Sequence, residues 1–295
     1  MTLSMHRTAR TARLAGAALA LTLAPASLLA HPGSGIVVDR LGQVWFMDTG
    51  SGLWKIDARG TLVKVAAPRF HWMALDEDDR FASTRFRPGL GGEITPAGAR
   101  PTLLVASDFP LTIAGDGNLY YPARRPGGAA VDITRVQPNG RSAPLAPVPL
   151  PWLNGLAAAP DGSLYYTEDR AIHRVTASGQ VSTVASRVTL RTCPKVPGND
   201  PGNPFLRGLA VDSVGNVFVA ASGCGSVLKV TPGGQVSTVL QLAPPWSPTA
   251  VALHGGNIYV LEYLHTDVED RLQWLPRVRR VSPNGTGAII AAVTR

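Results

Sequence analysis

A sixfold internal repeat constrains the fold of this chain more than any other feature. Blocks of fourteen residues, each with two hydrophobic runs around a short turn, recur at intervals of 37 to 53 residues. The blocks are GIVVDRLGQVWFMD from Gly35, WMALDEDDRFASTR from Trp72, PLTIAGDGNLYYPA from Pro110, GLAAAPDGSLYYTE from Gly155, GLAVDSVGNVFVAA from Gly208 and TAVALHGGNIYVLE from Thr249. Such a period predicts an architecture of repeated structural units.

Each block predicts two strands joined by a tight turn. A third strand with a shared pattern follows most blocks (LWKID, ITRVQ, IHRVT, VLKVT, VRRVS), and a Gly-containing turn then leads to a fourth. The second block is the most degraded, because Asp79 replaces the turn glycine. Six units of four strands predict an all-β fold, a six-bladed β-propeller with four antiparallel strands per blade. Since the first block begins so early, we expect side-chain packing between the first and last blades, without an added N-terminal strand, to close the ring.

The first thirty residues have the pattern of a signal peptide. Arg7, Arg10 and Arg13 precede an apolar run at 14–23, and cleavage is expected after Ala26 or Ala30. Ten apolar residues are too few to span a bilayer, which needs about 20. We therefore expect a signal peptide at 1–30, a single propeller domain at 31–295, no membrane span, and a secreted or periplasmic location.

The charge pattern does not indicate nucleic-acid binding. The full chain carries a formal charge of +8, and its basic residues are scattered, whereas nucleic-acid binders usually present a continuous basic stripe. We expect a monomeric soluble domain. Its two cysteines, Cys193 and Cys224, predict one disulfide in an oxidising compartment, worth roughly 3–4 kcal/mol of stability.

The repeats resemble NHL repeats and the propellers of the gluconolactonase, senescence-marker-protein and luciferin-regenerating-enzyme group. The segment NGLAAAPDGSLYYTED at 154–169 is especially similar to that group. The resemblance covers essentially the whole mature chain. It implies the propeller fold, which hosts lactonases, lyases, binding modules and scaffolds alike.

The resemblance also implies a ligand site on the top face, where loops enter the innermost strands and join second strands to third. The residues directly before the blocks are expected to ring the mouth of the central channel: Ser34, His71, Phe109, Asn154, Arg207 and Pro248. In metal-dependent relatives this ring supplies a Glu, an Asn and an Asp. Only Asn154 matches, while Ser34 and Arg207 replace the two carboxylates. A guanidinium has no acceptor atom, so a divalent cation such as Ca²⁺ or Zn²⁺ is disfavoured. Alternatively, the Asn154 amide caps a turn.

The ends of the second strands form another candidate ring that includes Asp48, Glu168 and Glu262. In-blade ion pairs with Lys55, Arg174 and Arg279 are the alternative interpretation. Three aromatic residues, each after a proline, are expected on the same face, either lining a pocket or wedged between blades: Trp152, Phe205 and Trp246.

These features predict an exported propeller that binds a small molecule or peptide at the top-face mouth. If it is an enzyme, hydrolysis of a lactone or ester is the reaction that the resemblance implies. His71 would act as general base (or as a metal ligand with His265), and Arg207 with Asn154 would stabilise an oxyanion. A propeller lyase and a non-catalytic interaction scaffold are the alternatives.

Overall fold

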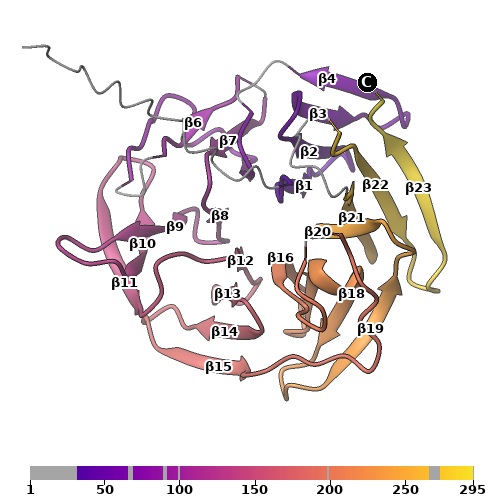
Figure 1. Cartoon of the computed structure of the whole chain (residues 1–295). Helices are drawn as coiled ribbons and strands as arrows, with labels where there is room; N and C mark the ends of the chain where they lie inside the picture. Colours follow the sequence, from indigo (N-terminus) through magenta and orange to yellow (C-terminus); the bar gives the residue numbers. More distant parts are fainter. Residues whose placement is uncertain are drawn as a thin grey trace, which may run out of the picture.

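The strands form six sheets around a central axis, as a six-bladed propeller requires (Figure 1). The computed structural model describes residues 32–65, 69–88, 92–98, 100–197, 199–265 and 273–294, so the predicted signal peptide lies outside the described residues. Blade 1 comprises β1 (Ile36–Val38), β2 (Val44–Asp48), β3 (Gly52–Ile56) and β4 (Leu62–Val65), and blade 2 comprises β5 (Trp72–Asp76), β6 (Thr95–Pro96) and β7 (Thr102–Ala106). Blade 3 comprises β8 (Thr112–Ile113), β9 (Leu119–Arg124), β10 (Val131–Val136) and β11 (Ser142–Val148).

The remaining three blades follow the expected four-stranded order. Blade 4 comprises β12 (Gly155–Ala158), β13 (Leu164–Glu168), β14 (Ala171–Val175) and β15 (Val181–Ala185). Blade 5 comprises β16 (Leu206–Val211), β17 (Val217–Ala221), β18 (Ser226–Val230) and β19 (Val236–Gln241). Blade 6 comprises β20 (Trp246–His254), β21 (Asn257–Leu264), β22 (Pro276–Val281) and β23 (Gly287–Ala292). Within the described ranges, the one helical segment is the 3₁₀ turn η1 (Ser222–Cys224), and no helix has the length and apolar character needed to cross a membrane.

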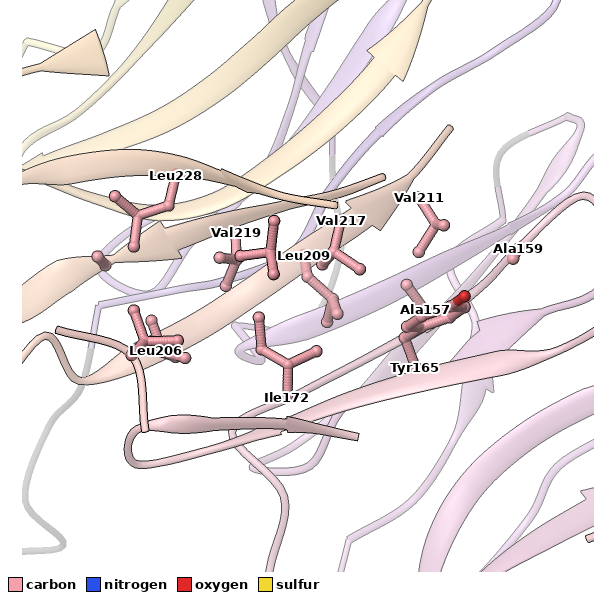
Figure 2. Packing of buried hydrophobic residues seen from close by; sticks show 13 residues of the cluster. Ala157, Ala159, Tyr165, Ile172, Leu206, Leu209, Val211, Val217, Val219 and Leu228 are labelled. Atoms are coloured by element: carbon pink, nitrogen blue, oxygen red, sulfur yellow. The ribbon is translucent and has the colours of Figure 1, made fainter. Parts of the chain in front are cut away.

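Apolar side chains fill all six interfaces between neighbouring blades. Six buried hydrophobic clusters are present, and each joins two adjacent blades. Figure 2 shows the cluster between blades 4 and 5, where Ile172 of β14 faces Leu206 and Leu209 of β16. This burial explains why the inner strands are apolar on both faces: each face packs against a different blade.

Glycine lets the inner strands approach closely at the top of the channel. A Cβ atom at Gly155 would lie 2.4 Å from the carbonyl oxygen of Arg207, and one at Gly208 would lie 2.5 Å from Cβ of Ala250. The Thr167 hydroxyl also donates to the Arg207 carbonyl over 2.9 Å. These contacts fix the backbone at Arg207, a predicted rim residue.

The ring closes through side chains, as predicted. Within the described residues β23 pairs with β22 alone (Figure 1). One buried cluster joins Ile36 and Phe46 of blade 1 to Ala250 and Leu261 of blade 6. The Tyr263 hydroxyl donates to the Met47 carbonyl over 2.7 Å, adding a buried polar contact across the same interface.

Blade 2 departs from the expected pattern. The block from Trp72 was predicted to supply first and second strands, but β7 pairs directly with β5, and the described sheet has three strands in the order β5-β7-β6. Asp79 adopts a φ of +57°, and Phe81 is buried against Phe86 with ring centroids 5.9 Å apart. The charged segment 77–80 therefore leads into a loop, and the fully buried β7 takes the second position because it is far more hydrophobic.

The predicted disulfide is present. Cys193 and Cys224 are bonded, with Cα atoms 4.5 Å apart across a sequence separation of 31. The bond ties the insertion that precedes blade 5 to η1, next to the strand that begins at Leu206.

Removing the disulfide should loosen the insertion and leave the propeller intact. For the double variant Cys193→Ser/Cys224→Ser we expect the free energy of unfolding to fall by about 3–4 kcal/mol, because a loop of this size is no longer closed in the unfolded chain. Urea denaturation measures the loss, and hydrogen exchange should rise at 189–204 but not in blade 3. Unchanged exchange in the insertion would contradict the pinning role.

Candidate functional site

A buried cationic centre occupies the rim of the channel mouth. Arg207 is 9% exposed, and its Nη2 atom donates to the carbonyl oxygen of Pro32 over 2.8 Å. No carboxylate of the described ranges forms an ion pair with Arg207. Burial, the larger effect, lowers the pKa of Arg207 to about 10, since desolvation disfavours the charged form.

Two side chains from the end of blade 6 accompany Arg207. Tyr263 is fully buried, and desolvation raises the pKa of its phenol above the ordinary value. Burial and then the charge of Arg207 lower the pKa of His265 to about 4. The buried Nε2 atom of His265 has no hydrogen-bond partner in the described part of the chain, whereas the ring also hydrogen-bonds to the Pro197 backbone.

His71 and Ser34 also lie in this rim and are buried. The Nδ1 atom of His71 lies 2.6 Å from Asp108 Oδ1, and the His71 carbonyl accepts the backbone N–H groups of Ser34 and Gly35 at 2.8 Å each. Ser34 lines the central channel, which encloses about 670 Å³ and extends to the turns after the inner strands.

The rim does not fit a divalent cation. Ser34 offers a hydroxyl and Arg207 a positive charge where the resemblance implies carboxylates. The described residues contain no group of three or more His, Cys, Asp or Glu side chains that could hold a metal. Asn154 alone retains the expected ligand type, and the guanidinium would repel the ion.

A separate pocket beside blade 4 unites four of the predicted ligand-binding residues. It encloses about 460 Å³, and its lining includes Trp152, Asn154, Glu168 and Phe205. Trp152 is 63% exposed, so it forms an open aromatic wall and not a wedge between blades. Phe205 adopts a φ of +41°, and its backbone N–H donates to Asn203 Oδ1.

Glu168 is held in this pocket by a histidine. Its Oε1 atom lies 3.0 Å from His173 Nε2, and His173 Nδ1 lies 3.2 Å from the Thr183 hydroxyl. The imidazole stacks on Tyr166 at 4.7 Å. In the register of β13 and β14, Tyr166 pairs with His173 and Glu168 with Ala171, so these side chains share one face of the sheet.

The expectation of ion pairs at the second-strand ends was correct for one residue of three. Glu262 is fully buried between Arg277 and Arg279, both at 2.5 Å. Glu168 pairs with His173, not Arg174, because Arg174 reaches Asp161 in the turn instead. Asp48 accepts hydrogen bonds from the Gly50 N–H and the Ser51 hydroxyl. Lys55 instead lies over the Trp45 ring.

The structure places three other candidates away from the blade 4 pocket. Phe109 is buried beside Tyr121 in the cluster between blades 2 and 3. The Trp246 ring stacks on the Arg277 guanidinium, with 3.5 Å between the guanidinium carbon and the ring centroid. Arg277 is also one of the two arginines that pair with Glu262. These contacts give Phe109, Trp246 and Glu262 a role in packing.

Sequence reasoning missed His173 and Asp108 as partners of the predicted residues. The short turn between Glu168 and Ala171 was a usable signal, because a tight hairpin brings residues five apart onto one face. Asp108 lies in blade 2, whose irregular repeat gave no strand register from which its neighbours could be predicted.

The fold and the top-face pocket define a six-bladed β-propeller with a cavity of small-molecule size. Residues 113–261 match the model of the SMP-30/gluconolactonase/LRE-like region, and the chain belongs to this family.

Two relatives share about half of the chain. The virginiamycin B lyase of Nocardia farcinica (strain IFM 10152) is 31% identical over 156 residues, 51% of this chain and 54% of that protein. The 6-deoxy-6-sulfogluconolactonase of Pseudomonas putida is 32% identical over 160 residues, 52% of this chain and 50% of that protein. The chain thus spans about half the length of the relatives it matches.

Solved structures share the fold at lower identity. Regucalcin from Agrobacterium tumefaciens, described as a calcium-binding protein, has a TM-score of 0.57 at 16% identity and covers 81% of this chain and 84% of its own. Virginiamycin B lyase from Staphylococcus aureus has a TM-score of 0.50 at 16% identity, covering 88% and 83%.

The depressed pKa of His265 predicts a pH dependence of stability. The folded pKa of about 4 lies below the unfolded value of about 6.5, so between them only the unfolded chain binds the proton. The free energy of unfolding should therefore fall by about 3 kcal/mol as pH drops from about 6.5 to about 4, and this contribution should level off below pH 4. Denaturation at several pH values measures it. His265→Gln should flatten the slope and His254→Gln should keep it. Equal slopes in wild type and His265→Gln would disprove the assignment.

Proposed function

We propose that this chain is an exported propeller that binds a small molecule in the blade 4 pocket and hydrolyses a lactone or ester bond there. One observation supports this above the others. Glu168 is oriented by His173 and still 31% exposed, in a cavity that also holds an amide and two aromatic walls. A carboxylate held in one orientation and facing a small-molecule cavity is suited to general acid–base chemistry.

The pocket offers separate elements for binding and for chemistry. Trp152 and Phe205 provide flat apolar surface for the body of a ligand. The Asn154 amide can donate to a carbonyl oxygen, which places an electrophilic carbon beside Glu168. His173 acts as a positioning residue, because its other ring nitrogen contacts Thr183 instead of the pocket.

The proposed step needs only water and the ester. Glu168 removes a proton from water, and the hydroxide oxygen bonds to the carbonyl carbon while the Asn154 amide stabilises the oxyanion. When the tetrahedral intermediate collapses, the C–O bond to the ring or alkoxy oxygen breaks, and protonated Glu168 returns its proton to that oxygen. This scheme assigns to Glu168 the general-base role expected of His71, whose ring nitrogen faces Asp108.

A lyase reaction is the second candidate, supported by the match to the Nocardia lyase. The same carboxylate could remove a proton from carbon next to a carbonyl, after which the C–O bond on the neighbouring carbon breaks and a carboxylate leaves. An interaction scaffold that binds a peptide in this pocket without turnover is the third.

Turnover should depend on Glu168. We expect Glu168→Gln to lower kcat in a lactone and ester screen by about a hundredfold or more, with little change in KM. His173→Gln should have a smaller effect on kcat, and Trp152→Ala should mainly raise KM. Glu93→Gln is the matched control, since Glu93 is similarly exposed and pairs with an arginine on blade 2.

The products distinguish the alternatives. Hydrolysis gives a hydroxy acid, whereas elimination gives an unsaturated product that absorbs in the ultraviolet. Ligand binding without turnover across the screen would favour the scaffold. Full activity in Glu168→Gln would exclude the proposed site.

Export should remove the first residues of the chain. The disulfide and the apolar run at 14–23 support this proposal. When the full chain is expressed in a Gram-negative host, we expect periplasmic or secreted protein whose mass corresponds to cleavage after Ala26 or Ala30. Leu19→Arg, which interrupts the apolar run, should leave the precursor in the cytoplasm. An intact Met1 on wild-type cytoplasmic protein would contradict export.

A further inference from the structure

Unpaired polar atoms gather at the top of the central channel. In the described ranges, four buried side-chain nitrogen or oxygen atoms have no hydrogen-bond partner, and three belong to the rim: Ser34 Oγ, Thr49 Oγ1 and His265 Nε2. Leaving such an atom without a hydrogen bond is unfavourable, because burial removes it from water without a replacement partner. With Arg207 on the neighbouring blade 5, these unbonded atoms indicate a place where a polar group of a ligand forms the missing hydrogen bonds.

Arg207 is the cation at this place, and its charge is uncompensated. A guanidinium has five N–H donors, but among the described residues the Arg207 side chain forms one hydrogen bond, to the neutral Pro32 carbonyl. Buried arginines are normally paired with carboxylates, because an unpaired buried charge is strongly unfavourable. No carboxylate in the described part of the chain performs this role.

The surrounding backbone is held from three other blades, so the centre is preorganised. Thr249 of blade 6 donates to the Gly33 carbonyl over 2.6 Å, and the Ser34 and Gly35 N–H groups donate to His71 before blade 2. Arg207 itself stands at the start of blade 5. A ligand group that binds here need not order the site first, which favours binding.

The central channel reaches the edge of this centre at Ser34, and Arg207 itself is not among its lining residues. Its lining includes Ser34 and also Gly208 and Ala250, the residues that bring blades 5 and 6 together directly beside Arg207. The cavity of about 670 Å³ is much larger than a small organic acid. An anion in the channel would therefore approach the centre beside Ser34, away from the blade 4 pocket.

We propose that the Arg207 centre is an anion-binding site that takes a compact carboxylate from the channel. The free N–H groups of the guanidinium match the two oxygens of a carboxylate. The Ser34 hydroxyl supplies a further donor. The site goes beyond the proposed catalytic pocket and does not depend on it. The rim thus uses a fixed positive charge of the protein where the family resemblance implies a metal ion.

Acetate is a suitable probe for this site. With wild-type protein in a buffer free of other carboxylates and phosphate, sodium acetate should raise Tm along a saturable curve, compared with sodium chloride at equal ionic strength. Calorimetry should give one acetate per chain. The side-chain NMR signal of His265, assigned with His265→Gln, should shift over the same concentration range.

Variants separate an anion site from a purely structural arginine. Arg207→Met should abolish the acetate-dependent rise, whereas Arg174→Met, which alters an arginine on the outer part of blade 4, should keep it. If Arg207→Met does not fold, Ser34→Ala should weaken acetate binding severalfold. No saturable effect in wild type, or an equal rise in Arg207→Met, would overturn the proposal. Because Glu168→Gln leaves this centre untouched, it should bind acetate normally, so the two proposals can fail independently.

Discussion

Burial of apolar side chains between adjacent blades is the interaction on which the rest of the structure depends. Each inner strand is sandwiched between two neighbours, so six clusters form a closed ring that can be completed only when blade 6 reaches blade 1. The Tyr263 contact with the Met47 carbonyl lies at that last interface. Because the ring is stabilised by packing between blades, the loops on its top face are free to carry polar groups that add little to stability.

The top face carries two different groups of polar residues. Beside blade 4, the exposed Trp152, the half-buried Phe205 and a carboxylate oriented by a histidine form an open pocket. At the axis, the buried Arg207 brings positive charge, and in the described ranges Ser34 Oγ and His265 Nε2 have no hydrogen-bond partner. The pocket suits acid–base chemistry on a neutral molecule, and the axis suits an anion. At the axis, Ser34 and Arg207 stand where the family resemblance implies carboxylates, so the rim lacks the oxygen ligands of a metal site.

The disulfide links these two regions. It holds the insertion at 189–204 against η1, so Phe205 and Arg207 begin blade 5 from a restrained segment. Phe205 faces the blade 4 pocket and Arg207 faces the axis, two residues apart on the same strand entry. A change in the insertion is therefore expected to affect both proposed sites.

The sequence alone determined the blade count, the inner strands, the side-chain closure of the ring and the Cys193–Cys224 bond, because these follow from periodic hydrophobicity, turn residues and cysteine number. The sequence also predicted that four ligand-binding candidates lie on one face of the propeller, because of their positions relative to the repeat: Trp152, Asn154, Glu168 and Phe205. Tertiary structure decided the rest. In blade 2, β7 occupies the position predicted for the second half of the repeat block, because the more hydrophobic segment takes the buried position. The pairing of Glu168 with His173, and the burial of Arg207 without a carboxylate, depended on side-chain directions and on contacts between distant blades, which no local pattern encodes.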